Sequence, residues 1–309
     1  MNDKNREELI DIILKKAINT QISTTNVPYL EIFTTTINDQ NFNYVVYEPS
    51  LCIILQGKKE LAFANETYSY DKNNYLLLST HLPIKVSIKD ARFEKPYVAF
   101  QIKFSIEEIY EVLKMINIDM KNKKSTSQKG LFIDSLDEKL SDSLYRFVKL
   151  LENSKQSIEF LSPMIKKEIL YNLLSSNANE FLIQFALDGT TTNQIVKVIN
   201  EIKTNFKDKL NIKELSKKFN LGETTLYNHF KTITSLSPIQ FQKQLRLEEA
   251  KRLLQNFNAE VSQVAFDVGY ESASQFSREF KRYFGKTPSC FINWIVIFIF
   301  KLSLIYFWV

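Results

Sequence analysis

The 309-residue chain contains few of the side chains that build disulfide frameworks and metal sites. Its two cysteines, Cys52 and Cys290, are too few for a disulfide framework and fit a reducing cytosol. It also has two histidines, His81 and His229, whereas a metal site needs several convergent ligands. We therefore expect no metal and no other cofactor, and we expect His81 to be a surface or loop residue beside a strand end.

Two further absences restrict the class of protein. No secretory signal opens the chain, whose first 20 residues are charged and amphipathic, and this predicts a cytoplasmic location. No grouping of a nucleophile with a base is recognisable either, so we expect no enzymatic activity. A chain of 309 residues exceeds the usual size of a single core, which makes two domains the default expectation.

Charge is divided unevenly along the chain. Residues 190–290 carry 16 Lys and Arg against 10 Asp and Glu, a net of +6, whereas residues 1–189 carry 23 against 25, a net of −2. Phosphate contacts belong to a basic surface, so nucleic acid is the partner expected of the second part. Because solvated helices are often lysine-rich as well, this charge is only supporting evidence.

Short β-prone runs fill the region from about Tyr29 to Phe104. They are residues 43–46, 50–55, 59–64, 67–70, 75–79, 84–88 and 98–104, with turn signals between them. Strands at this spacing predict a sandwich or barrel. Small barrels can enclose a ligand, and six aromatic residues are candidates for its wall, although the alternation of the strands favours ordinary core for any single one of them: Tyr47, Phe63, Tyr68, Tyr70, Tyr75 and Phe100.

Helical patterns follow this region. Ser105 to Glu108 predicts a capping box that opens a helix to about Asn117, and residues 121–130 form a polar loop. Amphipathic helices are expected over 135–152 and 163–174, and their apolar stripes need a partner, either the barrel or a second copy. Asp188-Gly189 marks a domain boundary, and Thr192 is expected to cap the next helix.

The stretch 259–284 has the features of a DNA-reading unit. A stripe at three- and four-residue steps predicts its first helix: Val261, Val264, Ala265 and Val268. Gly269 ends that helix, because only glycine adopts a left-handed backbone cheaply, and Ser272 can cap the next one. The second helix buries Phe276 and Phe280 and presents amides and cations outward, as a helix-turn-helix must to enter a major groove.

The same pattern occurs about 50 residues earlier. A first helix carries Ile212, Leu215 and Phe219, the segment 220–222 turns, and Thr224 or Thr225 opens a second helix. Ile212 precedes Val261 by 49 residues, whereas four later landmarks precede their counterparts by 50: Leu226, Phe230, Pro238 and Phe241. The extra residue therefore lies in the second turn, and the repeat indicates a duplicated unit.

These two units carry a resemblance to a known family. From Asn211 to Ser289 the chain resembles the DNA-binding domain of AraC/XylS regulators, through SPIQFQKQLRLEEAKRLL at 237–254 and VAFDVGYESASQFSREFKRYFGKTP at 264–288. Residues 47–84 resemble the cupin-like N-terminal domain of one AraC subgroup. The resemblance implies an α+β multidomain chain: residues 1–189 form a cupin-like β-barrel regulatory domain with flanking helices, and 190–291 form an all-α DNA-binding domain with two helix-turn-helix units.

The resemblance also implies which residues read DNA. The connecting helix, residues 237–255, spans roughly 28 Å, near the DNA turn of about 34 Å, so both recognition helices can enter successive major grooves. Nine outward residues are the candidates: Thr224, Tyr227, Asn228, Lys231, Ser274, Gln275, Arg278, Lys281 and Arg282. Many relatives carry arginine where this chain has Asn228, so their base preference is not carried over to the first unit. Arg246 and Glu248 on the connecting helix are expected to be structural.

The function implied is that of a sequence-specific DNA-binding transcription regulator. Its expected partners are double-stranded DNA, RNA polymerase, a small-molecule effector and a second copy of the chain. The alternative is a cupin-type small-molecule-binding protein or enzyme with an appended helical domain. The effector, the operator sequence and the direction of regulation stay open.

The last residues, 292–309, are almost wholly apolar and atypical of the family. About 18 apolar residues can span a bilayer, although Lys301 costs roughly 2.5 to 3.5 kcal/mol there. The other reading is a frameshifted or truncated terminus, because out-of-frame AT-rich codons yield Phe, Ile and Leu.

Overall fold

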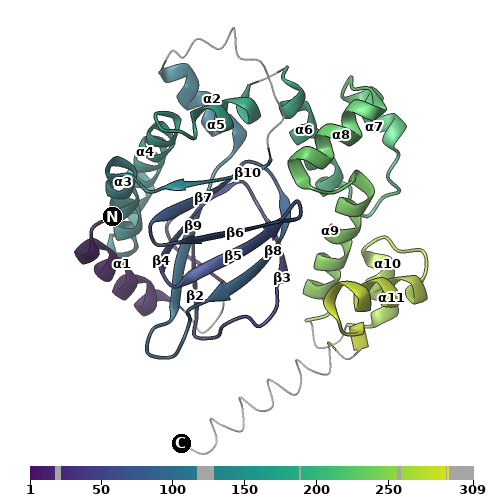
Figure 1. Ribbon diagram of the computed structural model, residues 1–309, viewed down its shortest axis with the longest axis horizontal. Helices are drawn as coiled ribbons and strands as arrows, with labels where there is room; N and C mark the ends of the chain where they lie inside the picture. The colour runs from purple at the N-terminus through teal and green to yellow at the C-terminus, as the bar shows by residue number, and fades with distance from the viewer. Residues whose placement is uncertain (18–21, 117–128, 188, 256–258, 290, 292–309) are drawn as a thin grey trace, which may run out of the picture. The chain divides into compact units, whose positions relative to one another are not determined.

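The computed structural model describes residues 1–17, 22–116, 129–187, 189–255, 259–289 and 291 (Figure 1). The apolar segment 292–309, Cys290 and most of the expected loop at 121–130 lie outside these residues. The chain forms two compact units. The first, here called the sheet unit, comprises Met1–Lys197 and Asn228–Ser235, and the second, the helical unit, comprises Val198–Tyr227 and the chain from Leu236 onward. The boundaries at 189 and 291 remain predictions.

Within the described residues, the strands of the sheet unit pair into two antiparallel sheets. The six-stranded sheet has the order β1 (Ile22–Thr24), β2 (Leu30–Thr35), β9 (Tyr97–Lys103), β4 (Ser50–Gln56), β7 (Asn74–Leu78) and β10 (Leu131–Ser135). The four-stranded sheet has the order β3 (Asn43–Tyr47), β8 (Leu82–Lys89), β5 (Lys58–Phe63) and β6 (Glu66–Asp71). The seven runs expected from the sequence are all strands.

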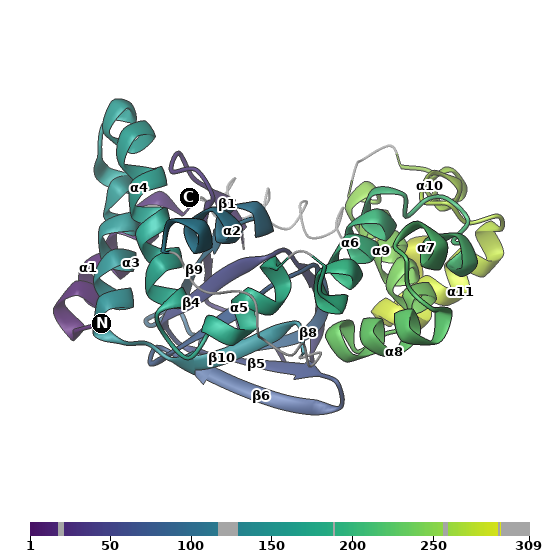
Figure 2. The same ribbon diagram turned by 90° about the horizontal axis from the view of Figure 1, so that it is seen from above.

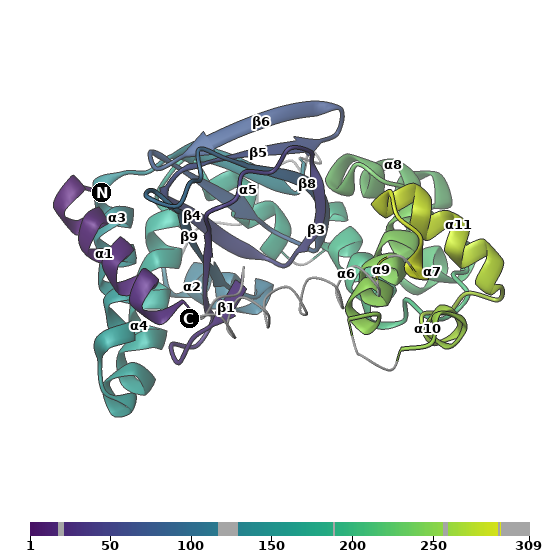
Figure 3. The same cartoon turned by 90° about the horizontal axis from the view of Figure 1, so that it is seen from below.

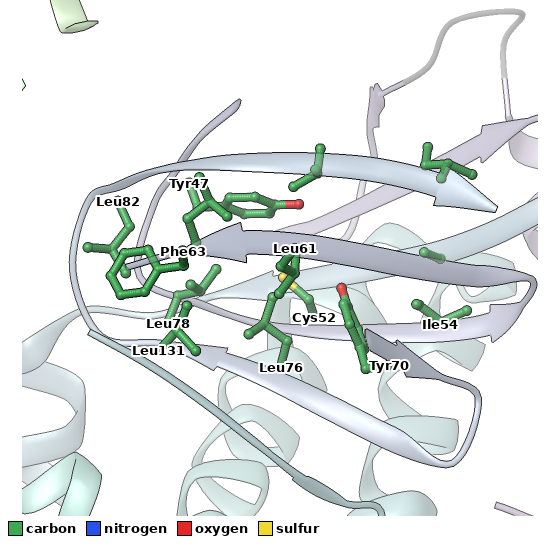
Figure 4. Packing of buried hydrophobic residues seen from close by; sticks show 14 of the residues in the cluster. Tyr47, Cys52, Ile54, Leu61, Phe63, Tyr70, Leu76, Leu78, Leu82 and Leu131 are labelled. Carbon is green, nitrogen blue, oxygen red and sulfur yellow. The ribbon is translucent and has the colours of Figure 1, made fainter. Parts of the chain in front are cut away.

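The two sheets share one apolar interior. Leu61 and Phe63 of the four-stranded sheet pack in the same cluster as Cys52, Leu76 and Leu78 of the six-stranded sheet (Figure 4). Strand β5 alternates buried and half-buried residues, as expected for a strand with one face on a core. Strand β4 is buried along nearly its whole length, which matches its unbroken apolar run. The expected sandwich or barrel is therefore two facing sheets.

Strand β10 and the helix after it differ from the sequence prediction. Residues 131–135 pair with β7 through the register Leu131↔Leu78. The helix expected over 135–152 consequently begins later, as α3 (Glu138–Lys149) followed by the short 3-10 helix η1 (Leu150–Glu152). Asp137 is the N-cap of α3, and its side chain accepts a hydrogen bond from the Leu140 N–H at 2.8 Å.

Helices cover the side of the six-stranded sheet away from β5 and β6 (Figures 2 and 3). They are α1 (Asp3–Lys16), α2 (Ile106–Met115), α3, α4 (Lys155–Leu174) and α5 (Asn179–Ala186). Helix α1 packs against β4 and β9, and α3 lies beside both α1 and α4. The predicted capping box at α2 is confirmed, because Ser105 and Glu108 exchange both hydrogen bonds.

Two predicted helix starts in this part of the chain are wrong. Helix α4 begins eight residues before Pro163, where the Ser154 hydroxyl accepts a hydrogen bond from the Ser157 N–H, and Pro163 lies inside the helix. In α6 (Thr191–Thr204) the capping hydroxyl belongs to Thr190, which accepts from the Asn193 N–H at 3.0 Å. The expected cap, Thr192, is buried within the helix.

Both helix-turn-helix units are present. The first consists of α7 (Ile212–Lys218) and α8 (Glu223–Thr234), and the second of α10 (Val261–Asp267) and α11 (Ala273–Phe284). Asn220 (φ 52°) and Gly269 (φ 90°) take the left-handed conformation at equivalent places, 49 residues apart. The second connection is one residue longer than the first, as the repeat predicts.

Helix α9 (Pro238–Leu253) links the two helix-turn-helix units and supplies much of the core of the helical unit. The helix starts with Pro238 and with a capping box between Ser237 and Gln240. Leu247, Ala250 and Leu254 belong to a buried cluster with α10 and α11 residues. This cluster packs both α10 and α11 against α9.

Arg246 of α9 anchors the second turn. Its guanidinium donates hydrogen bonds to the carbonyl oxygens of Phe206 and Gly269 at 2.7 Å and to those of Lys207 and Asp208 at 2.9 Å. These bonds hold the loop after α6 against the turn before α11. The expected structural role of Arg246 is confirmed.

Gly269→Ala should destabilise the protein more than Gly285→Ala. Both glycines have positive φ, and an added Cβ costs about 1 to 2 kcal/mol for that reason alone. At Gly269 the Cβ would also lie 2.2 Å from the Lys207 carbonyl oxygen, whereas nothing lies within 4 Å at Gly285. We expect a total loss of about 3 kcal/mol at Gly269 in urea unfolding. Equal losses of unfolding free energy in the two variants would contradict the predicted clash between a Cβ at position 269 and the Lys207 carbonyl oxygen.

Glu248 should make stability fall as pH rises. Burial raises the pKa of its carboxyl group to about 7, against the opposing effects of Lys251 and the nearby Tyr283 hydroxyl. Between the unfolded pKa of about 4.5 and the folded pKa, the folded state keeps a proton that the unfolded state releases. The free energy of unfolding therefore drops by up to about 3 kcal/mol between pH 4 and pH 8.

Glu248→Gln keeps a side chain of the same shape and removes the titration. Denaturant unfolding at several pH values should show a smaller decline for this variant than for the parent, with the two curves meeting near pH 4. If the unfolding free energy fell equally with pH in both proteins, the pH dependence would not come from Glu248.

Candidate nucleic-acid interface

Helix α11 separates its side chains into two faces. Phe276 and Phe280 are fully buried, and Ser272 caps the helix by accepting a hydrogen bond from the Gln275 N–H. The five candidates on this helix are all exposed: Ser274, Gln275, Arg278, Lys281 and Arg282. Their three- and four-residue spacing brings them together on the face opposite the phenylalanines.

Helix α8 has the same division. Leu226, Phe230 and Ile233 are fully buried. The candidates follow at steps of three and four residues: Thr224, Asn228 and Lys231 are exposed, and Tyr227 is half-buried. This helix therefore also has one polar face opposite its apolar stripe, as the sequence predicts.

The cations of α11 are available to a ligand. Among the residues that the structure describes, the side chains of Arg278 and Lys281 make no hydrogen bond or ion pair. Arginine offers a planar fork of donors that fits a guanine edge or a phosphate, and lysine offers a compact point charge. The face can therefore bind an anionic polymer without breaking an internal pair at these two positions.

Gln275 is held differently. Its side chain is hydrogen-bonded to Glu279, one helical turn further along. Glu279 also accepts hydrogen bonds at 2.9 Å from the Lys243 ammonium and the Tyr270 hydroxyl. Burial favours the neutral form of Glu279, but these hydrogen bonds outweigh it and lower the pKa of the carboxyl group. The ionised carboxylate thus fixes Gln275 to α9 and to the turn.

Sequence reasoning missed this network. The four-residue step from Gln275 to Glu279 is a signal that could have indicated their contact. The links to Lys243 and Tyr270 have no such local signal, because they depend on how α9 packs on α11.

The sheet unit offers no metal site in its described residues, and no cluster of three or more potential ligands occurs elsewhere in the described chain. His81 lies in the loop between β7 and β8, directly before β8 begins, as the sequence predicts, but its side chain is buried and only 9% exposed. Its Nε2 lies 3.6 Å from a carboxylate oxygen of Glu48.

No helix among the residues covered by the structure is long and apolar enough to cross a membrane.

The aromatic candidates of the sheet unit fall into two groups. Tyr47, Phe63 and Tyr70 belong to the cluster between the sheets, and Tyr68 packs against it. Tyr75 and Phe100 are buried outside that cluster. Tyr75 lies 6.3 Å from the Phe132 ring, measured between centroids.

Two helix-turn-helix units with exposed polar recognition faces, joined in one chain to a two-sheet domain, define a DNA-binding regulator. Comparison with protein families gives the particular family. Residues 26–181 match the AraC-type transcriptional regulator N-terminus, and residues 215–293 match a helix-turn-helix domain. The chain belongs to the AraC family of transcriptional regulators.

Similar proteins have the same organisation over most of their length. The Msm operon regulatory protein of Streptococcus mutans is 25% identical over 84% of this chain and 86% of its own. The virulence regulon transcriptional activator VirF of Shigella flexneri is 24% identical over 81% of this chain and 91% of its own. ToxT of Vibrio cholerae O395 has a similar fold, with a TM-score of 0.56, 16% identity, and coverage of 85% of this chain and 99% of its own.

These comparisons decide between the two functions considered from the sequence. The family consists of transcription regulators, so the chain is a DNA-binding regulator and not an enzyme. The predicted fold class is confirmed as well, with a β-rich N-terminal domain, flanking helices and a helical C-terminal domain.

Proposed function

We propose that this regulator is a cytoplasmic transcription activator that contacts DNA through the nine candidates on α8 and α11. Activation is supported by two relatives whose names describe activators, VirF and the lactose operon transcription activator of Staphylococcus xylosus. An activator acts on RNA polymerase, which is therefore a proposed partner. The observation that carries the DNA contacts is the exposed face of α11, where Arg278 and Lys281 have no internal partner in the described chain.

The two recognition helices are assigned to successive major grooves. Helix α9 has 16 residues and is about 24 Å long, so the units at its ends are separated by less than the DNA turn of about 34 Å. On this geometry, Arg278 reads a guanine edge and Gln275 or Asn228 reads adenine. Lys231, Lys281 and Arg282 contact phosphates, while Thr224, Tyr227 and Ser274 complete the two faces.

The sheet unit is proposed to bind an effector. ToxT has been solved with an unsaturated fatty acid and with (E)-4-(8-methylnaphthalen-1-yl)but-3-enoic acid. We propose the two facing sheets of this chain as the place where a small molecule binds.

A second copy of the chain is the proposed partner of α4. Phe160, Met164 and Tyr171 are 64%, 53% and 48% exposed, at steps of four and seven residues. Exposed apolar residues on one helical face are typical of an interaction surface.

Selection from random double-stranded DNA with the full chain, followed by gel shift, tests the central proposal. An enriched site with two half-elements about one helical turn apart is the expected result. Absence of any enriched sequence would overturn it.

Arg278→Ala should weaken binding to the selected site by about 1 to 3 kcal/mol and relax the preference at one base pair. Arg252→Ala is a suitable control, because Arg252 is an exposed arginine of α9 that pairs with Glu249. Footprinting titrations on the selected site and on its single-base variants measure both effects. If the Arg278→Ala variant kept the same DNA affinity and the same base preference, Arg278 would not be a base-contacting residue.

Lys281→Ala should weaken binding equally on all sequences. Loss of one phosphate contact reduces the slope of log K against log salt by about 1. Titrations of the selected and a scrambled site between roughly 50 and 200 mM salt measure this slope. An effect confined to the selected site would instead indicate a base contact.

A further inference from the structure

Helix α11 carries one acidic residue among its cations and amides. Glu279 directly follows Arg278 and lies one helical turn after Gln275, two of the candidates for reading DNA. A carboxylate at a DNA surface repels the phosphates and lowers affinity. The place of Glu279 on this helix is therefore better explained by specificity than by affinity, because specificity is often gained from a group that disfavours other partners.

Both carboxylate oxygens of Glu279 are bonded to partners outside α11. Its Oε1 accepts a hydrogen bond from the Lys243 ammonium of α9 at 2.9 Å, and its Oε2 accepts one from the Tyr270 hydroxyl of the turn, also at 2.9 Å. The Glu279 side chain is 13% exposed. The Tyr270 ring packs edge-on against Phe276, with 5.3 Å between the ring centroids. The carboxylate thus has a defined place between α9, the turn and α11.

The Gln275 amide completes this group. Its side chain is hydrogen-bonded to Glu279, which lies four residues later on the same side of the helix. Burial opposes the ionised form of Glu279, but its hydrogen bonds outweigh burial and lower the pKa of the carboxyl group. An ionised carboxylate can only accept hydrogen bonds, so the amide nitrogen of Gln275 must face it. The carbonyl oxygen lies on the other side of the planar amide and therefore faces away from Glu279.

This orientation decides which base edge the exposed Gln275 side chain fits. An amide that offers its carbonyl oxygen and its second N–H matches adenine, whose major-groove edge has the N6 donor beside the N7 acceptor. Guanine offers two acceptors, O6 and N7, at the same edge. The fixed carbonyl oxygen would face one of these acceptors and leave it without a donor, which weakens binding.

The first recognition helix has no equivalent of this arrangement. The repeat, with its offset of 50 residues, places Thr225 and His229 at the positions of Gln275 and Glu279. Neither residue supplies an amide or a carboxylate, so the pair cannot select one amide orientation on α8. The amide of Asn228 on α8 lies outside the Glu279 network. The base pairs read by α8 are therefore an internal reference for the effects of changing Glu279.

We propose that Glu279 is the positioning residue that makes Gln275 select adenine over guanine in the major groove. Lys243 and Tyr270 hold the carboxylate, the carboxylate holds the amide nitrogen, and the amide oxygen accepts from the N6 amino group of the base. This inference rests on the proposed DNA contacts and deepens them, because it assigns the base preference of α11 to a residue that does not itself touch the base.

Binding titrations of the full chain on the selected DNA site and on its single-base variants test this role. The pair read by Gln275 is the one at which Gln275→Ala abolishes the base preference. At this pair we expect the parent protein to bind adenine about tenfold more tightly than guanine. In Glu279→Gln the neutral amide can donate as well as accept, so Gln275 can take both orientations. The ratio of adenine to guanine affinity should fall to about twofold, partly through tighter binding of guanine.

The ratio separates a positioning role from a purely structural one. If Glu279 only held α11 on α9, its replacement would weaken adenine and guanine sites in parallel, and this result would overturn the proposal. A lowered preference at the pairs read by α8 would overturn it too.

Two further variants support the measurement. Tyr270→Phe keeps the ring and removes one hydrogen bond to Glu279, so it should lower the ratio by a smaller factor, and it provides the test if Glu279→Gln does not fold. Glu249→Gln is the matched control, because Glu249 is a glutamate of α9 that pairs with Arg252 at 2.7 Å. The control should keep the parent ratio. An unchanged ratio in both the Glu279 and the Tyr270 variants would refute the positioning role.

The double variant Gln275→Ala/Glu279→Gln completes the experiment. We expect Glu279→Gln to have no further effect on base preference once the Gln275 amide is absent. A further change would mean that Glu279 acts without Gln275, and this would overturn the proposal.

The failure of this inference and that of the proposed function give different results. If Gln275→Ala keeps every base preference while Arg278→Ala relaxes one, only the role of Gln275 and Glu279 is removed. If the full chain enriches no DNA sequence at all, the proposed DNA contacts are removed, and the inference with them.

Discussion

The position of the second recognition helix depends on how Arg246 holds two backbone segments together. Its guanidinium bonds to three consecutive carbonyl groups at 206–208 and to the carbonyl of Gly269. Arginine suits this role because its donors are fixed in one plane and its charge persists at any physiological pH. Burial lowers the pKa of Arg246 from its ordinary value, which is high enough for the guanidinium to stay charged. The turn before α11 is thereby tied to the loop after α6, and glycine at 269 allows the two backbones to meet.

The reading face of α11 then combines two kinds of side chain. Gln275 is positioned by Glu279, whose carboxylate also holds Lys243 and Tyr270. Arg278 and Lys281 are unconstrained in the described structure. A fixed amide favours one hydrogen-bonding geometry, whereas free cations can adapt to phosphates or base edges along the groove. Directional and adaptable groups thus share one helical face.

The sequence predicts the features that have a local cause. The faces of α8 and α11 follow from the spacing of Phe230 and Phe280, and the turns follow from residues that accept a left-handed backbone. Strand β10 was missed because its pairing with β7 joins segments more than 50 residues apart. The start of α4 was missed because Pro163 resembles a first-turn proline, although the capping hydroxyl lies nine residues earlier at Ser154. The Glu279 network depends on packing between helices, for which no local pattern exists.

Buried ionisable groups in this chain meet the cost of burial in three ways. Lys166 and Glu279 are paired within the protein. Glu248 avoids ionisation, since burial raises its pKa to about 7 and its proton is retained below that pH. Lys59 stays charged without a carboxylate partner in the described structure, because the Tyr47 hydroxyl and the rings of Phe33, Tyr47 and Tyr97 surround its ammonium group and its pKa is raised.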